Sequence, residues 1–281
     1  MLRRIIAIAL LCLPSVLRAQ VGMSIDIVSA VSHIQPGRPF EVGVFLHHEP
    51  GYHTYWKLPG IVGVPTSIAW ELPKGFTATE LQYPAPERTF MFQIMAQGYE
   101  RDVLLWATIT PPANLKPGTE VTLKGKAGWM CCAKSCNPGF KDLSLTLPID
   151  LSPPKADPKW APVFLKEQAT VPQPSSAWKA SAAESGKKLV LTLIPTSPEA
   201  RPIDDPSKLI VFTEDGWIDT DGKQEIRPLP GGGIEVTLAC GSEAYMAKTA
   251  PEKALCIIQN DTGWVKNGSL YSLRVSPVIT R

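Results

Sequence analysis

Charge is scarce in this sequence, and the two signs nearly cancel. Charged residues make up 19% of the 281 residues, with 28 Lys and Arg against 26 Asp and Glu, for a formal net charge of +2. A balance this close to neutral gives no electrostatic reason for a nucleic-acid partner, and no basic run suits an anionic membrane. Beyond the N-terminus, no apolar run approaches the roughly 18 residues of a spanning helix. We therefore expect neither nucleic-acid binding nor direct membrane insertion.

Helical periodicity is lacking as well. No stretch keeps a 3.6-residue apolar period over three turns, and the 28 Pro and 21 Gly argue against a helical bundle. Period-two alternation is present instead, and each alternating run predicts a half-buried strand. Together with the turn formers between them, these runs predict an all-β fold, an immunoglobulin-like antiparallel β-sandwich over residues 20–151. The clearest runs are Phe40–Leu46, Ile68–Leu72, Val121–Trp129 and Leu143–Ile149.

The chain changes character after the predicted sandwich. Six prolines fall within residues 152–176 with little alternation, which predicts a semi-rigid Pro-rich linker. Strand patterns resume beyond it, for example at Leu209–Phe212 and Leu270–Val275. We expect a second, smaller β-domain over residues 177–281.

The first 19 residues have the layout of a secretory signal peptide. Arg3 and Arg4 precede an apolar run over Ile5–Leu13, and Ala19 ends a plausible cleavage site. The sequence thus predicts a protein that is exported and soluble after cleavage.

Five cysteines remain after the predicted signal peptide. Thiols tend to pair in an oxidising compartment, and an odd number leaves at least one of them free, intermolecular or metal-bound. The five are Cys131, Cys132, Cys136, Cys240 and Cys256.

Cys132 and Cys136 follow a strongly alternating run and flank a short turn. If the chain reverses over Ala133–Ser135, the two cysteines are opposed at about 4.5–5.5 Å between Cα atoms, within the roughly 4.4–6.8 Å that a disulfide tolerates. Lys134 between them would favour a thiolate electrostatically. The spacing by itself supports a redox pair and a structural bridge equally.

The other three cysteines have simpler interpretations. Cys131 could form a vicinal bridge with Cys132, but we prefer a buried thiol, because alternation places it on the inner face with Trp129. Cys240 ends one predicted strand and Cys256 lies in the next. We expect a structural disulfide between them, stapling neighbouring strands, rather than a second redox pair.

A metal site is the main alternative. The sulfurs of Cys131, Cys132 and Cys136, with Met91, Met95 and Met130 nearby, are soft ligands that suit Cu(I). His47, His48 or His53 could join the cysteines in such a site. The four histidines, all before residue 54, match no zinc-ligand spacing, however, and we expect them on the surface or in turns. No HExxH motif, phosphate loop or Ser/His/Asp elbow is present, and we predict no cofactor.

Four segments form a recognisable set: Gly51–Gly60, Tyr83–Arg88, Gly98–Leu105 and the Trp-x-x-Cys-x-x-x-Cys-x-Pro-Gly stretch at Trp129–Gly139. Together they resemble the N-terminal periplasmic domain of the DsbD family of thiol:disulfide interchange proteins, especially its ScsB-like branch. Val211–Glu214 is similar to the start of the following β-domain of that family.

The resemblance implies a thiol–disulfide oxidoreductase whose redox cysteines are Cys132 and Cys136. It implies a membrane-embedded DsbD-type electron donor on a separate chain and periplasmic thioredoxin-like partners, in processes such as cytochrome c assembly or copper tolerance. A loop near the pair can act as a cap in the family, and we expect Phe90 or Phe92 to do so here. The Cu(I) module and a purely structural sandwich with stapling disulfides remain the alternatives.

Overall fold

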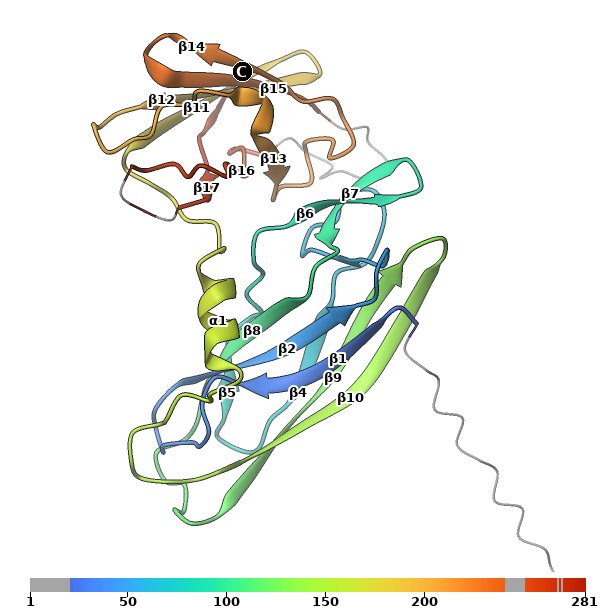
Figure 1. Cartoon of the computed structure of the whole chain (residues 1–281), viewed down its shortest axis with the longest axis vertical. Helices are drawn as coiled ribbons and strands as arrows, with labels where there is room; N and C mark the ends of the chain where they lie inside the picture. The colour runs from blue at the N-terminus through green and yellow to red at the C-terminus, as the bar shows by residue number, and fades with distance from the viewer. Residues whose placement is uncertain (1–20, 241–250, 267, 269) are drawn as a thin grey trace, which may run out of the picture.

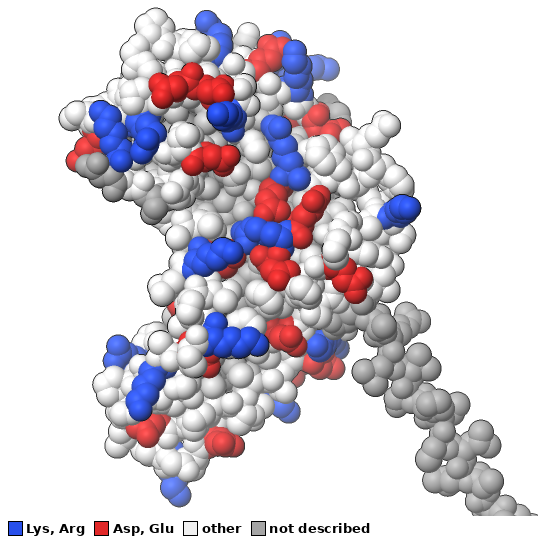
Figure 2. Space-filling view, in the orientation of Figure 1, with Lys and Arg blue, Asp and Glu red and all other residues white. Residues whose placement is uncertain are grey.

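The computed structural model describes residues 21–240, 251–266, 268 and 270–281. The predicted signal peptide, residues 1–19, lies outside the described residues. Figure 1 shows two β-rich lobes stacked along the long axis, the first domain below and the second above. Acidic and basic side chains are interspersed on the face that Figure 2 shows, as the near-neutral composition leads one to expect.

The first domain is an immunoglobulin-like β-sandwich, as predicted. Two antiparallel sheets face each other, and the apolar residues of each alternating strand fill the space between them, for example Val44, Leu105 and Ala127. One sheet has the order β1-β2-β8-β5, with bounds Met23–Ser29, Phe40–His48, Val103–Thr110 and Thr77–Ala78. The other has the order β10-β9-β4, with bounds Cys136–Pro148, Glu120–Cys132 and Ser67–Glu71.

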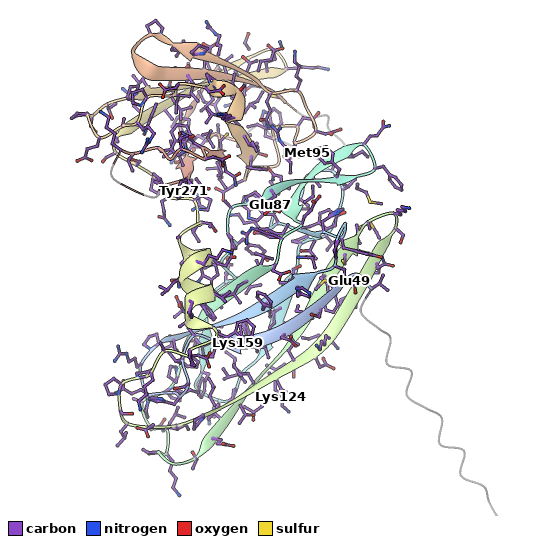
Figure 3. The ribbon with its side chains drawn as sticks, viewed as in Figure 1. Glu49, Glu87, Met95, Lys124, Lys159 and Tyr271 are labelled. Carbon is purple, nitrogen blue, oxygen red and sulfur yellow. A yellow bond between two sulfur atoms is a disulfide. The ribbon has the colours of Figure 1, made fainter. Side chains whose placement is uncertain are left out.

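A small third sheet stands beside the end of the sandwich where β9 turns into β10. Its order is β3-β7-β6, with bounds Thr54–Tyr55, Ile94–Tyr99 and Glu87–Met91. Figure 3 shows Glu87 and Met95 on this sheet, which extends towards the second domain. We call β6, β7 and the turn between them the β6–β7 hairpin.

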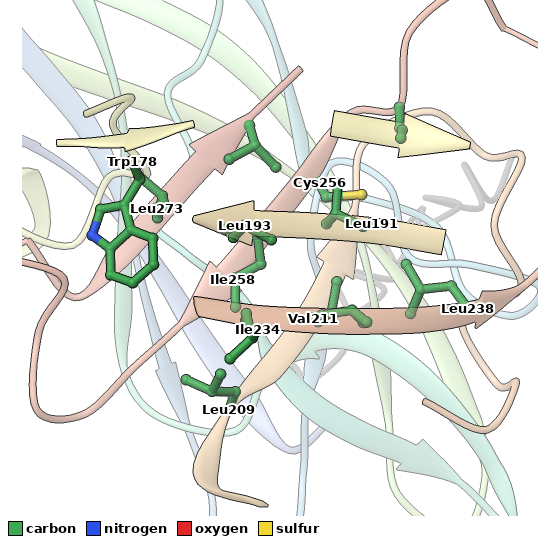
Figure 4. Close-up of a cluster of buried hydrophobic side chains, with 14 of the residues drawn as sticks. Trp178, Leu191, Leu193, Leu209, Val211, Ile234, Leu238, Cys256, Ile258 and Leu273 are labelled. Atoms are coloured by element: carbon green, nitrogen blue, oxygen red, sulfur yellow. The ribbon is translucent and has the colours of Figure 1, made fainter. Parts of the chain in front are cut away.

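The second domain is a smaller two-sheet β-structure. Trp178, Leu191 and Ile258 belong to its core, which Figure 4 shows between the two sheets. The larger sheet has the order β14-β15-β12-β11-β18, with bounds Glu225–Leu229, Gly233–Ala239, Lys188–Pro195, Trp178–Ser185 and Ile279–Thr280. The smaller has the order β13-β16-β17, with bounds Ile210–Thr213, Cys256–Gln259 and Ser272–Val275. Two 3₁₀ turns, η1 (Pro206–Lys208) and η2 (Pro230–Gly232), precede β13 and β15.

The segment expected to be a linker is packed against the first domain and contains a helix. α1 (Ala161–Gln168) buries Phe164 in a cluster with Val28, Leu104 and Trp106. The prediction missed α1 because two turns are too short to show a 3.6-residue period among prolines. In the described part of the chain, no helix has the length and apolar character needed to cross a bilayer.

The two domains share buried contacts. Phe212 and Ile257 of the second domain pack into the cluster that holds Trp56 and Tyr99 of the first. Gln97, fully buried, joins them by hydrogen bonds: its Nε2 donates to Thr213 O (3.0 Å), and Thr213 N donates to its Oε1 (2.8 Å). Burial of a polar side chain is tolerated here because both ends of the amide are paired. The domains therefore meet at a packed interface.

Candidate functional site

A disulfide joins the ends of the β9–β10 hairpin. Cys136 lies directly opposite Cys132 in the strand register, their Cα atoms are 4.2 Å apart, and their sulfurs are bonded. The chain reverses over Ala133–Ser135, where Ala133 N donates to Ser135 O (3.1 Å). The cross-strand arrangement predicted from the spacing is confirmed.

The two bonded cysteines differ sharply in exposure. Cys132 is fully buried, against Tyr55 and Ala96. Cys136, the first residue of β10, is exposed, and so is Lys134 in the turn between them. A thiolate from outside can therefore approach the disulfide only at the Cys136 sulfur.

The β6–β7 hairpin reaches this disulfide. Met91 Sδ lies 3.5 Å from Cys136 Sγ, and Met91 also packs against the buried Cys132 cluster. Phe90, the neighbouring strand residue, is 53% exposed and lines a groove beside the second domain, so it lies on the other face of the hairpin. Phe92 is 74% exposed at the turn. The hairpin is where the prediction placed a cap, but the side chain in contact with the sulfur is Met91.

Two side chains that sequence reasoning did not select connect to the exposed sulfur. The Tyr55 hydroxyl lies 4.0 Å from Cys136 Sγ and 3.2 Å from His53 Nε2. His53 also exchanges two backbone hydrogen bonds of 2.9 Å with Cys132. Burial raises the pKa of Tyr55 to about 12 and lowers the pKa of His53, so both side chains are neutral near pH 7. Both lie in Gly51–Gly60, a stretch that the family similarity singled out.

Three of the four histidines are buried, although we expected them on the surface or in turns. His47 is exposed, 2.9 Å from the Asp102 carboxylate. The others are not on the surface, because folding buries them and pairs their rings by hydrogen bonds, although His33 does lie in a bend between β1 and β2. His48, for example, is 2.8 Å from Arg101 O and 2.9 Å from Thr54 Oγ1. The three buried histidines are His33, His48 and His53.

Cys131 is a buried free thiol, as predicted. It packs in the sandwich core with Trp129, on the opposite face of β9 from Cys132, and burial raises the pKa of its thiol to about 12. Because adjacent strand residues point to opposite faces, its sulfur does not converge with those of Cys132 and Cys136. Among the described residues, no group of three or more His, Cys, Asp or Glu is placed to hold a metal ion.

The predicted disulfide between Cys240 and Cys256 does not form in this structure, where both thiols are free. The prediction assumed that the two residues lie on neighbouring strands. Instead, Cys240 follows β15 in the larger sheet of the second domain, whereas Cys256 begins β16 in the smaller one. Cys256 pairs across its sheet with Thr213 and Val275.

The first domain is thus an immunoglobulin-like sandwich that carries a cross-strand disulfide at one end. One cysteine of this disulfide is buried and the other is exposed. These features place it in the class of disulfide-bearing β-domains. One family model matches most of the first domain. The model of the N-terminal domain of the thiol:disulfide interchange protein DsbD matches residues 26–148, which include both bonded cysteines.

The whole fold, second domain included, is similar to a solved structure. The N-terminal periplasmic domain of ScsB from Proteus mirabilis aligns over 93% of this chain and 95% of its own, with a TM-score of 0.65 and 18% sequence identity. The yeast GGA1 GAE domain covers 47% of this chain and 96% of its own at 17% identity, but its TM-score of 0.29 is too low to support any argument. No curated protein matches this sequence.

Proposed function

We propose that this chain is a thiol–disulfide interchange protein that passes electrons through the Cys132–Cys136 pair. The observation that supports it most is the asymmetry of the disulfide, with Cys136 exposed and Cys132 buried, in a domain of the DsbD family. A bridge that only stabilises the fold needs no accessible sulfur, whereas an exchange reaction does.

Reduction begins at the exposed sulfur. A thiolate of the electron donor attacks Cys136 Sγ, a donor–Cys136 disulfide forms, and Cys132 leaves as a thiolate that takes up a proton. A second donor thiolate then attacks the donor sulfur of this mixed disulfide and releases Cys136. The donor ends as a disulfide, and this protein has gained two electrons and two protons.

Oxidation is the reverse sequence with a second partner. The Cys136 thiolate attacks the partner disulfide, and one partner sulfur leaves as a thiol. Cys132, adjacent across the hairpin, then attacks Cys136 Sγ and releases the partner as a dithiol. In this assignment Cys136 is the attacking cysteine and Cys132 the resolving one.

Tyr55 and His53 support the Cys136 thiolate. With the proton on His53 Nε2, that nitrogen donates to the Tyr55 oxygen and Tyr55 donates to the sulfur. Because its pKa is raised to about 12, the Tyr55 hydroxyl keeps its proton at neutral pH. A hydrogen bond to the charged sulfur favours the thiolate over the thiol.

The partners belong to the same proposal. The donor would be a membrane-embedded DsbD-type protein and the acceptors periplasmic thioredoxin-like proteins, with this chain in the periplasm. Cytochrome c assembly and copper tolerance are the processes that such a relay could serve, and they stay predictions.

The reduction potential tests the proposal. The protein is equilibrated in graded glutathione buffers, alkylated and mapped by peptide mass. A midpoint between about −120 and −270 mV is expected, whereas one below about −300 mV would identify a structural bridge.

Trapping then tests which cysteine attacks. Cys132→Ser leaves the exposed Cys136 without a resolving thiol, so it should accumulate mixed disulfides with thioredoxin-like proteins. Cys136→Ser should not accumulate mixed disulfides, because the remaining thiol of the pair, Cys132, is buried. Cys131→Ser is the matched control and should behave as wild type. Equal trapping by the first two variants would overturn the assignment.

A further inference from the structure

The outer part of the β6–β7 hairpin has little support from its own sheet. β7 pairs with β3 only at Gly98 and Tyr99, whereas it pairs with β6 from Gly98 out to Ile94, which lies opposite Met91. A two-stranded ribbon is at best marginally stable by itself in water. Other contacts must therefore hold the end of the hairpin that carries Met91 against the disulfide.

The second domain supplies such contacts. Asp221 Oδ1 accepts a hydrogen bond from the backbone N–H of Met95 (2.8 Å), 126 residues away in the sequence. Arg88 Nη2 donates to Gln224 Oε1 (3.0 Å), and the Gln224 amide is itself bonded to the backbone of Val211. Figure 3 shows Met95 on the part of the hairpin nearest the second domain.

These bonds cross a groove rather than a packed interface. A cavity of about 290 Å³ separates the hairpin from the loop before β14, and its lining includes Phe90, Met95 and Thr220–Gln224. The other face of the hairpin packs on the Cys132 cluster through Met91 and Ala96. On the groove side, the polar contacts to the second domain are what tie the hairpin in place. The Asp221 bond acts on the backbone of the hairpin, whereas the Arg88 bond acts through a long flexible side chain.

We propose that Asp221 is a positioning residue: by binding the backbone of the β6–β7 hairpin, it keeps Met91 on Cys136 and limits the access of thiols to the disulfide. The second domain thereby regulates the reactivity of a disulfide in the first. This inference rests on the proposed function for its biological meaning, but the contacts and their test do not require it.

The test is the rate at which dithiothreitol reduces the disulfide in the full chain. The reagent gives two electrons and two protons to the Cys132–Cys136 pair and becomes a cyclic disulfide. Asp221→Ala should be reduced about five- to tenfold faster, the effect of losing one hydrogen bond of ordinary strength. Asp221→Asn should restore the wild-type rate, because its amide oxygen can accept the same bond. Lys223→Ala, an exposed change in the same loop, is the control and should leave the rate unchanged.

A double-mutant cycle shows whether Asp221 acts through Met91. Met91→Ala should also accelerate reduction, and Met91→Ala with Asp221→Ala should be no faster than Met91→Ala alone. An unchanged rate in Asp221→Ala, or effects that multiply in the double variant, would overturn the inference. A midpoint potential below about −300 mV would contradict the proposed function but would leave these relative rates, and hence this inference, intact.

Discussion

Three cysteines within six residues have three different environments in this protein. Cys131 faces the sandwich core, Cys132 lies under Tyr55, and Cys136 is exposed at the start of β10. Cys131 and Cys132 differ in environment because adjacent strand residues point to opposite faces. Cys132 and Cys136 differ because the end of their hairpin lies at the edge of the domain. Reactivity follows from these environments, because a buried thiol with a raised pKa is a poor nucleophile at neutral pH.

Replacing Tyr55 tests the hydrogen bond to the exposed sulfur. In the reduced protein, Tyr55→Phe should raise the pKa of Cys136 by about 1 unit, because a hydrogen bond to a charged group contributes about 1.5 kcal/mol or more. The measurement is the alkylation rate of Cys136 against pH. The wild-type rate should fall with decreasing pH at a lower pH than the rate of the variant.

Tyr52→Phe is the matched control for this measurement. The Tyr52 ring packs against Gly22 and against the core cluster that holds Cys131, not against the exposed Cys136. Removing its hydroxyl should therefore leave the pH profile of Cys136 in place. Identical profiles for Tyr55→Phe and wild type would exclude the hydrogen bond to the thiolate.

At the scale of the element, α1 secures the segment between the domains. Phe164 fills a cluster under β2 and β8, and Arg101 reaches from the first domain to the buried Glu167 at 2.7 Å and to Glu87 at 2.9 Å. The helix has only eight residues, so tertiary contacts rather than helix propensity stabilise it.

Substitutions in α1 should reflect that dependence. Phe164→Ala should lower the free energy of unfolding by about 3–5 kcal/mol, because it leaves a cavity in a closed cluster. Leu165→Ala removes a similar apolar side chain that is 68% exposed, and it should change stability by less than about 0.5 kcal/mol. Urea denaturation of both variants gives the comparison, and equal losses would contradict the packing described for α1.

At the scale of the molecule, the sheet β13-β16-β17 belongs to both domains at once. Val211 and Ile258 point into the core of the second domain, while their neighbours Phe212 and Ile257 point into the cluster of the first. The continuous apolar runs of β13 and β16 follow from this position, because a sheet buried on both faces needs apolar residues at every position.

Because of that shared sheet, the two domains should unfold together. Wild type should show a single calorimetric transition, and Phe212→Ala should move it to lower temperature as one peak, with a loss of about 3–5 kcal/mol. Val278→Ala, in an exposed side chain of the second domain, should shift it little. Two separate transitions in the wild-type protein would contradict a common unfolding unit.

Local rules were sufficient for much of the fold and part of the site. Period-two alternation predicted the long strands, and the short turn between Cys132 and Cys136 predicted their register and the disulfide. The same rules could not place Cys240 and Cys256 in different sheets, because separation along the chain does not tell which of two sheets a strand joins.

Local pattern was enough for strongly alternating strands such as β2, β9 and β10, for the hairpin between β9 and β10, and for the pairing of Cys132 with Cys136. Each of these depends on residues within one turn or two adjacent strands. Only the tertiary structure decided that Cys136 is the exposed sulfur, that Met91 rather than Phe90 contacts it, and that Asp221 holds the hairpin in place. These features depend on contacts between segments tens to more than a hundred residues apart, and no local pattern encodes which distant side chain fills a given position.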